Sequence, residues 1–291
     1  MNEGIIISLN GGIYSVLSAG EIYECKARGI FRNIGVSPVP GDECFFSDGV
    51  ISKIKTRKNL LLRPAVANVD NLCIVASTTE PAPNFKIIDM LTAECEIQGI
   101  EPIIIITKND LKDGSDIIEI YEKSGYYTFS SNFKSKEIPQ EFYEKIKNKI
   151  NVFTGNSGAG KSTFLNMLCP NLDLATNEIS QKLHRGRHTT RMTELFEFEG
   201  GFIADTPGFS SIDIKLSQNL DCDNLALGFR DFSDYIGKCK FRNCSHISEK
   251  GCAIIEAVNL GKIEKSRHES YKTMFNELKT VNPWEKKQKA K

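Results

Sequence analysis

A glycine-rich segment between an apolar run and a helical stretch constrains the fold more than any other feature of this chain. Residues 155–162 read Gly-Asn-Ser-Gly-Ala-Gly-Lys-Ser and follow the apolar run Ile150 to Thr154. This arrangement is typical of a phosphate-binding loop, whose backbone N–H groups surround phosphate oxygens at a helix N-terminus. The alternative is an ordinary glycine-rich turn, which the two flanking patterns disfavour. The sequence therefore predicts an α/β nucleotide-binding domain.

Two side chains at the end of this loop have specific expected roles. Lys161 is expected to reach the β and γ phosphates of the nucleotide. The Ser162 hydroxyl is expected to bind Mg²⁺, because a hard cation prefers oxygen ligands. The predicted phosphate-binding residues are Gly155, Asn156, Ser157, Gly158, Ala159, Gly160, Lys161, Ser162 and Thr163.

A second motif indicates which base is bound. The tetrapeptide Thr-Lys-Asn-Asp at residues 107–110 follows the strand-like run Ile103 to Ile106. The Asp110 carboxylate can accept hydrogen bonds from N1–H and the exocyclic amine of guanine, a donor pair that adenine lacks. Alone, such a tetrapeptide is more often a solvated loop, but a phosphate loop in the same chain reverses that preference. The predicted guanine-binding residues are Thr107, Lys108, whose stem would cover the base, Asn109 and Asp110.

A third motif, Asp-Thr-Pro-Gly at residues 205–208, follows the strand-like run Gly201 to Ala204. We expect Asp205 to hold Mg²⁺ through a water and the Gly208 N–H to contact the γ-phosphate. The polar segment 186–190, Gly-Arg-His-Thr-Thr, is either a mobile switch segment or a plain surface loop. In the first case Thr189 or Thr190 completes the Mg²⁺ shell, and the sequence does not distinguish between them.

The order of these motifs is unusual. In Ras-like GTPases the phosphate loop precedes the guanine-reading motif, whereas here Asp110 precedes Gly155. If the strands keep their usual places in the sheet, the chain is circularly permuted. Permutation preserves a site because its parts meet in space, and it moves the termini. The nucleotide core would then end just after Gly208, so that the nucleotide state could be transmitted to the C-terminal domain.

Hydrophobic patterning divides the chain into three predicted domains. Short apolar runs separated by Gly, Asn and Pro over residues 1–63 indicate a small β-barrel with a tight turn at residues 38–42. Over residues 64–218, strand-like runs alternate with helical patterns at 85–98 and 115–124, which predicts a mainly parallel sheet with helices on both faces. Residues 219–291 are expected to form an α-helical domain with an amphipathic basic helix from Lys262 to about Lys279.

Three cysteines and one histidine of the last domain are closely spaced, as Cys239-x₄-Cys244-x-His246-x₅-Cys252. Three thiolates and one imidazole match a closed tetrahedral Zn²⁺ site with a structural role; chance clustering is the alternative. The remaining cysteines are expected to be small buried hydrophobes: Cys25, Cys44, Cys73, Cys95, Cys169 and Cys222.

Composition limits the class of protein. The apolar content of 40% is ordinary for a soluble globular chain. Because 37 basic residues balance 37 acidic ones, the chain has no excess positive charge that would indicate nucleic-acid binding. From residue 261 to 291, however, nine Lys or Arg face four Glu. The N-terminal segment has an acid where a signal peptide is basic, and no run approaches the ~20 apolar residues of a membrane span. We therefore expect a cytoplasmic protein without a membrane partner.

Together these motifs resemble the ribosome small-subunit-dependent GTPase A family (RsgA, also called YjeQ), over nearly the whole chain. Residues 63–70, Arg-Pro-Ala-Val-Ala-Asn-Val-Asp, are similar to the segment that leads into the family's GTPase domain, and residues 186–190 are similar to its switch segment. The resemblance implies an N-terminal OB-fold, a circularly permuted GTPase core and a zinc domain. It also implies a role in late maturation of the small ribosomal subunit.

Two positions depart from common GTPase motifs. Thr107 replaces the Asn of the usual guanine motif, which predicts weaker support for the phosphate loop. Phe209 follows Gly208 where Ras-like enzymes have the Gln that orients water, so hydrolysis needs another group. The resemblance nominates His188 as the water-positioning residue, and a purely structural role for His188 is the alternative.

The expected activity is hydrolysis of GTP to GDP and phosphate, slow alone and stimulated by the small ribosomal subunit. Ribosomal RNA would contact the barrel surface and the basic helix, and the protein would act as a monomer. A solvated charged helix is the alternative for the tail. Two other functions remain open: an ATP-using P-loop enzyme, and a nucleotide-gated RNA-binding scaffold with negligible hydrolysis.

Overall fold

The computed structural model describes residues 1–29, 31, 35–62, 64–170, 193–206, 214, 217 and 219–281. The chain forms two compact units. The first comprises Met1–Cys73, Glu137–Gly155 and Lys161–Gly208, and the second comprises Ile74–Lys136, Asn156–Gly160 and Phe209–Lys291. Each unit is therefore assembled from segments that are far apart in the sequence.

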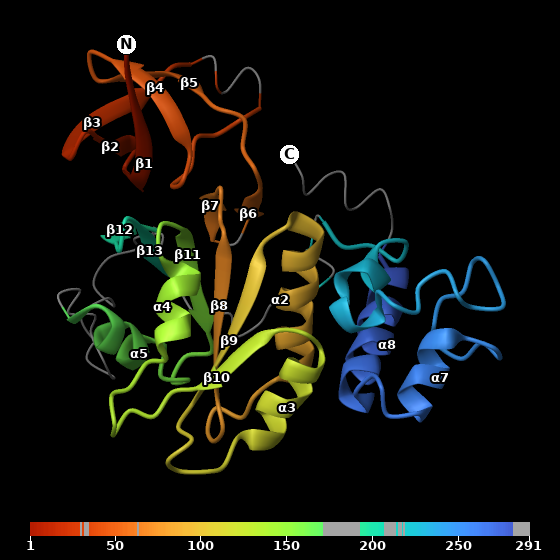
Figure 1. The fold of residues 1–291 in the computed structure, drawn as a ribbon. Coiled ribbons are helices and arrows are strands. Elements are labelled where there is room, and N and C mark those ends of the chain that lie inside the picture. Colours follow the sequence, from red (N-terminus) through yellow and green to blue (C-terminus); the bar gives the residue numbers. More distant parts are fainter. Residues whose placement is uncertain are drawn as a thin grey trace. The chain divides into compact units, whose positions relative to one another are not determined.

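The N-terminal segment is a closed five-stranded barrel, as the short apolar runs predicted (Figure 1). Its strands pair in the order β1-β2-β3-β5-β4, with β3 and β5 parallel and the other pairs antiparallel. Alternate side chains point inward and form the core, which includes Ile6, Val16, Cys25, Phe46 and Ile51. The strand bounds are β1 Asn2–Asn10, β2 Ile13–Ser18, β3 Glu21–Ala27, β4 Glu43–Ser47 and β5 Val50–Ile54.

The predicted turn at residues 38–42 lies beside the barrel and is held by a buried carboxylate. Asp42 is fully buried; one oxygen accepts the Val39 N–H at 2.8 Å, and the Arg57 guanidinium binds both oxygens. Gly41 has φ +88°, and a Cβ there would lie 2.1 Å from the Ala67 carbonyl oxygen. Glycine is therefore required at this position for two independent reasons.

The rest of the first unit contains buried parallel strands. β11 (Ile150–Gly155) is buried along its whole length and pairs in parallel with β13 (Gly201–Asp205), which forms an antiparallel hairpin with β12 (Leu195–Phe198). A continuous apolar run is the pattern expected for a strand covered on both faces. The other elements of this unit are β6 Leu60–Leu62, β7 Ala65–Ala67, α4 Gln140–Ile146 and α5 Lys161–Leu168.

In the second unit, β9 (Glu101–Thr107) and β10 (Tyr127–Ser130) pair in parallel. The helices α2 (Phe85–Gln98) and α3 (Ser115–Lys123) agree with the helical patterns in the sequence. β8 (Asn71–Ser77) runs through both units, and the strand order of the sheet is β10-β9-β8-β11-β13-β12. Among the strand pairs of this sheet that the described residues define, β9 with β10 and β11 with β13 are parallel and β12 with β13 is antiparallel, which confirms the prediction of a mainly parallel sheet.

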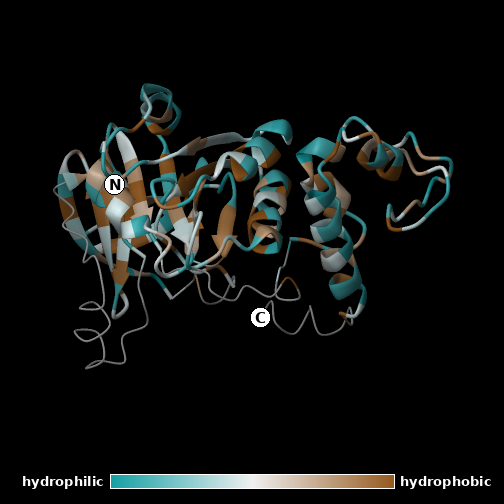
Figure 2. Cartoon of the chain, turned by 90° about the horizontal axis from the view of Figure 1, so that it is seen from below, coloured by the Kyte–Doolittle hydropathy of each residue, from teal (hydrophilic) through white to brown (hydrophobic). Residues whose placement is uncertain are grey.

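The C-terminal part of the second unit is helical and shares its core with α2. It contains η4 Leu225–Gly228, η5 Arg230–Phe232, α7 Ala253–Asn259 and α8 Lys265–Lys279. Phe229, Phe232 and Tyr271 are fully buried in one cluster with Met90 and Ala93 of α2. In Figure 2 the strands are mainly coloured as hydrophobic, whereas the helices carry hydrophilic stretches. None of the helices in the described part of the chain is long and apolar enough to cross a membrane.

The basic helix α8 contains a buried arginine. Arg267 is 0% exposed, and its guanidinium binds Asp89 of α2 at 2.6 Å and Asp231 of η5 at 2.8 Å. The same guanidinium lies 4.7 Å from the centroid of the Phe229 ring. We define these three charged residues, Arg267, Asp89 and Asp231, as the arginine cluster. The arginine cluster joins α8, α2 and η5, which lie so far apart in the sequence that their contact could not be predicted from it.

We predict that Arg267→Met lowers the free energy of unfolding by about 3 kcal/mol or more, because it leaves two buried carboxylates without their counter-charge. Urea denaturation of the purified protein measures this loss. The matched control is Lys272→Met on the same helix, which removes an ion pair of 2.8 Å with the more exposed Glu269. That change should cost less than about 0.5 kcal/mol. Equal effects of the two substitutions would contradict the structural role of the arginine cluster.

Candidate functional site

The glycine-rich segment connects β11 to α5, as the sequence predicted. Gly158 and Gly160 have φ of +82° and +93°, values that other residues rarely adopt. A Cβ at position 160 would lie 2.8 Å from the Phe133 ring, so that position also has no room for a side chain. Ser162 and Thr163 belong to the first turn of α5, where N–H groups lack partners within the helix. The backbone therefore has the form of an anion-binding loop.

Lys161 and Asp205 form an ion pair at the carboxyl ends of β11 and β13. The register of the two parallel strands pairs Phe153 with Asp205, which brings the ends of the strands to one edge. Next to Asp205, the Thr206 hydroxyl donates to the Phe153 carbonyl at 2.7 Å. Lys161, predicted to bind phosphate, and Asp205, predicted to bind Mg²⁺, are thus adjacent.

The residues expected for Mg²⁺ binding fit a hard cation. Ser162 offers a hydroxyl and Asp205 a carboxylate that is partly exposed, and both are oxygen donors. A cation held by these residues would neutralise phosphate charge, and Lys161 would supply a further positive charge.

The Thr107–Asp110 motif follows β9 and is tied to the phosphate loop. Thr107 is fully buried, and its hydroxyl donates to the Ala159 carbonyl at 2.5 Å. Its sequence separation from Ala159 is 52 residues, so this contact is purely tertiary. The Asn109 side chain accepts the Gly114 N–H at 2.6 Å, and Thr78 donates to the Lys108 carbonyl at 2.8 Å. Thr107 thus makes one direct hydrogen bond to the loop, and the expectation that it supports the loop less well than Asn would stays a prediction.

The segment after β10 also lies beside both motifs, and the sequence reasoning missed it. Phe133 lies against Gly160, and the Lys134 ammonium is 3.3 Å from the Asp110 carboxylate. Ser131 is fully buried, and its hydroxyl has no hydrogen-bond partner in the described structure. The available signal was the strand-like run at residues 127–130, because parallel strands bring their carboxyl ends to the same edge.

Several predicted residues lie outside the described part of the chain. These are His188, Thr189, Thr190 and Gly208, together with Arg63 and Phe209. The predicted roles of the switch segment stay predictions.

Cys239, Cys244, His246 and Cys252 converge as the spacing predicted, with one ligand atom from each within 4.8 Å of the others. The Cys239 and Cys252 sulfurs are 3.8 Å apart, and His246 Nδ1 lies 3.6 and 3.4 Å from these sulfurs. Tetrahedral Zn²⁺ with bonds of ~2.3 Å to sulfur and ~2.0 Å to nitrogen needs ligand separations of about 3.5–3.8 Å. The donor set and its spacing therefore fit a closed zinc site.

Backbone and side-chain contacts hold this cluster. The Ala253 N–H donates to Cys239 Sγ at 3.4 Å, and Tyr271 donates to the Ser245 carbonyl at 2.9 Å. Burial opposes ionisation of Glu249, but hydrogen bonds from the Ser245 hydroxyl and from the Ser245 and Ser248 N–H groups outweigh it and lower the pKa of the carboxyl to about 2. Burial raises the pKa of the Cys244 thiol to about 12 and lowers that of His246. Without a cation, the Cys244 thiol would therefore stay protonated at neutral pH.

Four of the other cysteines, Cys25, Cys44, Cys73 and Cys95, are buried, which agrees with the expected packing role. Cys169 and Cys222 are only half-buried.

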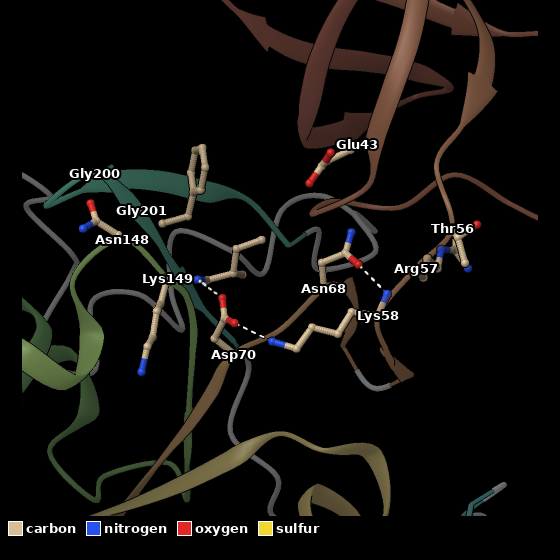
Figure 3. Close-up of a pocket in the computed structure, with 12 residues that line it drawn as sticks. Glu43, Thr56, Arg57, Lys58, Asn68, Asp70, Asn148, Lys149, Gly200 and Gly201 are labelled. Atoms are coloured by element: carbon tan, nitrogen blue, oxygen red, sulfur yellow. Dashed lines mark hydrogen bonds and ion pairs between the residues drawn. The ribbon is translucent and has the colours of Figure 1, made fainter.

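A polar pocket of about 450 Å³ lies within the first unit, at the amino end of β11 (Figure 3). Lys58 and Asp70 form an ion pair of 2.5 Å across it, and Asp70 also accepts the Ile150 N–H at 2.9 Å. The phosphate loop begins at the other end of the same strand. Because it lies at the opposite end of β11 from the loop, this pocket does not form part of the candidate nucleotide site.

Comparisons with known proteins agree with these features. The family model for the RsgA GTPase matches residues 54–215, and that for the RsgA N-terminal domain matches residues 3–50. The small ribosomal subunit biogenesis GTPase RsgA of Geobacillus sp. (strain WCH70) is 39% identical over 97% of this chain and 99% of its own. The protein of the same name from Enterococcus faecalis is 40% identical over 98% of each chain.

Two solved structures are similar over almost the whole chain. The crystal structure of YjeQ from Thermotoga maritima has a TM-score of 0.79 at 33% identity and covers 97% of this chain and 99% of its own. The crystal structure of YloQ, described as a circularly permuted GTPase, has a TM-score of 0.77 at 32% identity and covers 97% and 96%.

We predict that the purified protein contains about one equivalent of zinc and that its zinc affinity falls as the pH falls. Metal binding requires thiolates, and burial raises the pKa values of the Cys244 and Cys252 thiols in the folded, metal-free protein, so each binding event releases protons. Competition with a chromogenic chelator at pH 8 and pH 6 measures the effect, and Cys252→Ser should lower the zinc content. A zinc content below about half an equivalent would count against the site.

Proposed function

The chain belongs to the RsgA GTPase family, and from that premise we propose that it hydrolyses GTP during late maturation of the small ribosomal subunit, which stimulates the reaction. Membership of this GTPase family supports the hydrolysis of GTP. The names of the relatives support the small ribosomal subunit as the binding partner. The observation that supports this function best is the hydrogen bond from Thr107 to Ala159, because it joins the base-reading motif to the phosphate loop.

We assign the phosphate-binding role to residues 155–163. Backbone N–H groups of the loop and the N-terminus of α5 would surround the phosphates, and Lys161 would leave Asp205 to contact the β and γ phosphates. Ser162 and Asp205 would then hold Mg²⁺, which supplies Lewis-acid stabilisation of the phosphate charge. The present Lys161–Asp205 ion pair supports this assignment, since both side chains already point to one locus.

Asp110 is the proposed guanine reader. Its carboxylate would accept N1–H and the exocyclic amine, and the Lys134 ammonium, 3.3 Å away, would help to orient it. The Lys108 stem remains the proposed cover of the base. Its ammonium donates to the Glu80 carbonyl, which restrains the stem.

Hydrolysis requires a water aligned with the γ-phosphate, and the proposed residue for this is His188. Thr189 or Thr190 would complete the Mg²⁺ shell, and the Gly208 N–H would contact the γ-phosphate. Binding of the subunit would order this switch segment and so raise turnover.

The proposed organisation keeps three domains, residues 1–63, 64–218 and 219–291, in a cytoplasmic monomer. Ribosomal RNA would contact the barrel, as in other OB-folds, and helix α8. Because Arg267 is buried, the basic residues that α8 offers to RNA are Lys265, Lys272 and Lys279.

We predict that Asp110→Asn lowers the affinity for GTP at least about tenfold and raises that for xanthosine triphosphate. The amide can donate to the carbonyl that xanthine carries in place of the amine, and loss of a charge-assisted pair costs about 1.5–3 kcal/mol. Fluorescent-nucleotide competition measures both constants. Asp113→Asn is the matched control, because Asp113 caps Ser115 in the same loop. If Asp110→Asn left the base preference unchanged, Asp110 would not be the reader, and an ATP-using enzyme would regain support.

We predict that small ribosomal subunits raise the rate of single-turnover GTP hydrolysis about tenfold or more. The His188→Ala variant tests which residue this stimulation needs. That variant should keep its GTP affinity and lose most of the stimulated rate, because water positioning acts in the transition state. Rapid-quench assays with and without purified subunits measure both. Absence of stimulation would favour the scaffold function, and equal losses of affinity and rate would indicate a structural role for His188.

A further inference from the structure

The segment between the first two zinc ligands forms an exposed loop that the nucleotide chemistry does not use. It reads Lys-Cys-Lys-Phe-Arg-Asn-Cys from residue 238 to 244. We call residues 238–243 the zinc loop. Its side chains other than the ligand Cys239 are exposed.

Phe241 is a solvent-exposed aromatic residue. Its exposed fraction is 52%, whereas every other Phe and Tyr side chain within the described ranges is buried or half-buried. The aromatic residues of the nearby core, such as Phe229 and Tyr271, are 0% and 1% exposed. The ring therefore does not stabilise the fold by burial, and its face is available to stack on a flat partner.

Cations surround this ring. Lys238, Lys240 and Arg242 belong to the zinc loop, and Lys250 lies two residues before Cys252; none of the four forms an ion pair with a described residue. The Lys240 ammonium is 5.7 Å from the Phe241 ring centroid. The neighbouring acid, Glu249, is occupied by internal hydrogen bonds. The loop thus presents uncompensated positive charge beside an open aromatic face.

The backbone of the loop is restrained by the cysteine and histidine cluster and by a hydrogen bond. Cys239 and Cys244 both belong to that cluster, and the Lys240 N–H donates to the Gly251 carbonyl at 2.9 Å. The Lys240 stem packs so closely on Gly251 that a Cβ there would lie 3.0 Å from it. A loop held in this way loses little conformational entropy when a ligand binds.

We propose that the zinc loop binds single-stranded RNA, with an unpaired base stacked on Phe241 and phosphates contacted by Lys240 and Arg242. The ring can reach only a base that is not already stacked in a duplex, and Lys240 and Arg242, which flank Phe241 in the sequence, supply positive charge for the phosphates of the same strand. This inference rests on the proposed function for the presence of RNA, and it adds a contact beyond the barrel and α8.

The test uses full-length, zinc-loaded protein and a short oligouridylate that carries one 2-aminopurine, with an RNA duplex of equal length for comparison. Phe241→Ala should weaken binding of the single strand about fivefold or more and abolish the 2-aminopurine quenching. Lys240→Gln with Arg242→Gln should lower the slope of log affinity against log salt by about 1.4, or ~0.7 for each phosphate that the protein no longer neutralises.

Matched controls are Leu260→Ala, an exposed apolar residue at 64%, and Lys147→Gln, an exposed lysine outside the loop. Both should bind the single strand as the unmodified protein does. Zinc content and GTP turnover without subunits should be unchanged in every variant. If Phe241→Ala loses zinc, Phe241→Leu replaces it, since leucine keeps the apolar volume and removes the aromatic face.

Three results would overturn the proposal. These are unchanged single-strand affinity in Phe241→Ala or Phe241→Leu, equal losses for single strand and duplex, and weaker binding to small subunits without any change for the RNA probe. The last result would indicate a protein partner. Failure of the unmodified protein to cosediment with small subunits would instead contradict the proposed function, and the oligouridylate assay does not depend on that outcome.

Discussion

The hydrogen bond from the Thr107 hydroxyl to the Ala159 carbonyl is the interaction on which the candidate nucleotide site depends. It fastens the end of β9 to the phosphate loop, although the two residues lie 52 positions apart. Both groups are fully or almost fully buried, so water cannot replace the bond. The short segment after β10 adds Phe133 against Gly160 and Lys134 beside Asp110. The proposed base-reading loop and the glycine-rich loop are thereby joined without regard to their order in the chain.

This independence from order is the physical basis of the permuted arrangement. A site needs only that the carboxyl ends of parallel strands share an edge. In the first unit, β13 ends at Asp205, which pairs with Lys161. In the second unit, β9 ends at Thr107, which binds Ala159, and the segment after β10 places Lys134 beside Asp110. Permutation leaves those ends in place and changes which segment leads into the C-terminal part. In this chain the segment after Asp205 does so, and it is the segment whose motif senses the γ-phosphate in the proposed function.

The C-terminal part is stabilised by two kinds of polar centre. The cysteine and histidine cluster fixes a loop-rich region that has little apolar surface of its own, while Arg267 links α8 to Asp89 of α2 and Asp231 of η5. The arginine cluster makes movement of α8 along α2 costly, because any displacement would separate buried charges. The aromatic core around Phe229 and Tyr271 reinforces the same packing. Such a rigid support suits the zinc loop, whose exposed ring and cations gain from fixed positions.

The sequence by itself determined the elements and the chemistry that contiguous residues encode. Helix α2 matches its predicted bounds, the buried run of β11 was recognisable from its apolar residues, and the spacing of Cys239, Cys244, His246 and Cys252 predicted a closed metal site. These signals are local, because hydrophobic periodicity, glycine positions and metal-ligand spacing are each set by residues that lie close together in the sequence. Only the tertiary structure decided that Thr107 supports Ala159, that Lys134 faces Asp110 and that Arg267 is buried rather than exposed on a basic helix. Each of these contacts joins residues whose separation along the chain carries no periodic signal, so only the packing of the folded chain defines them.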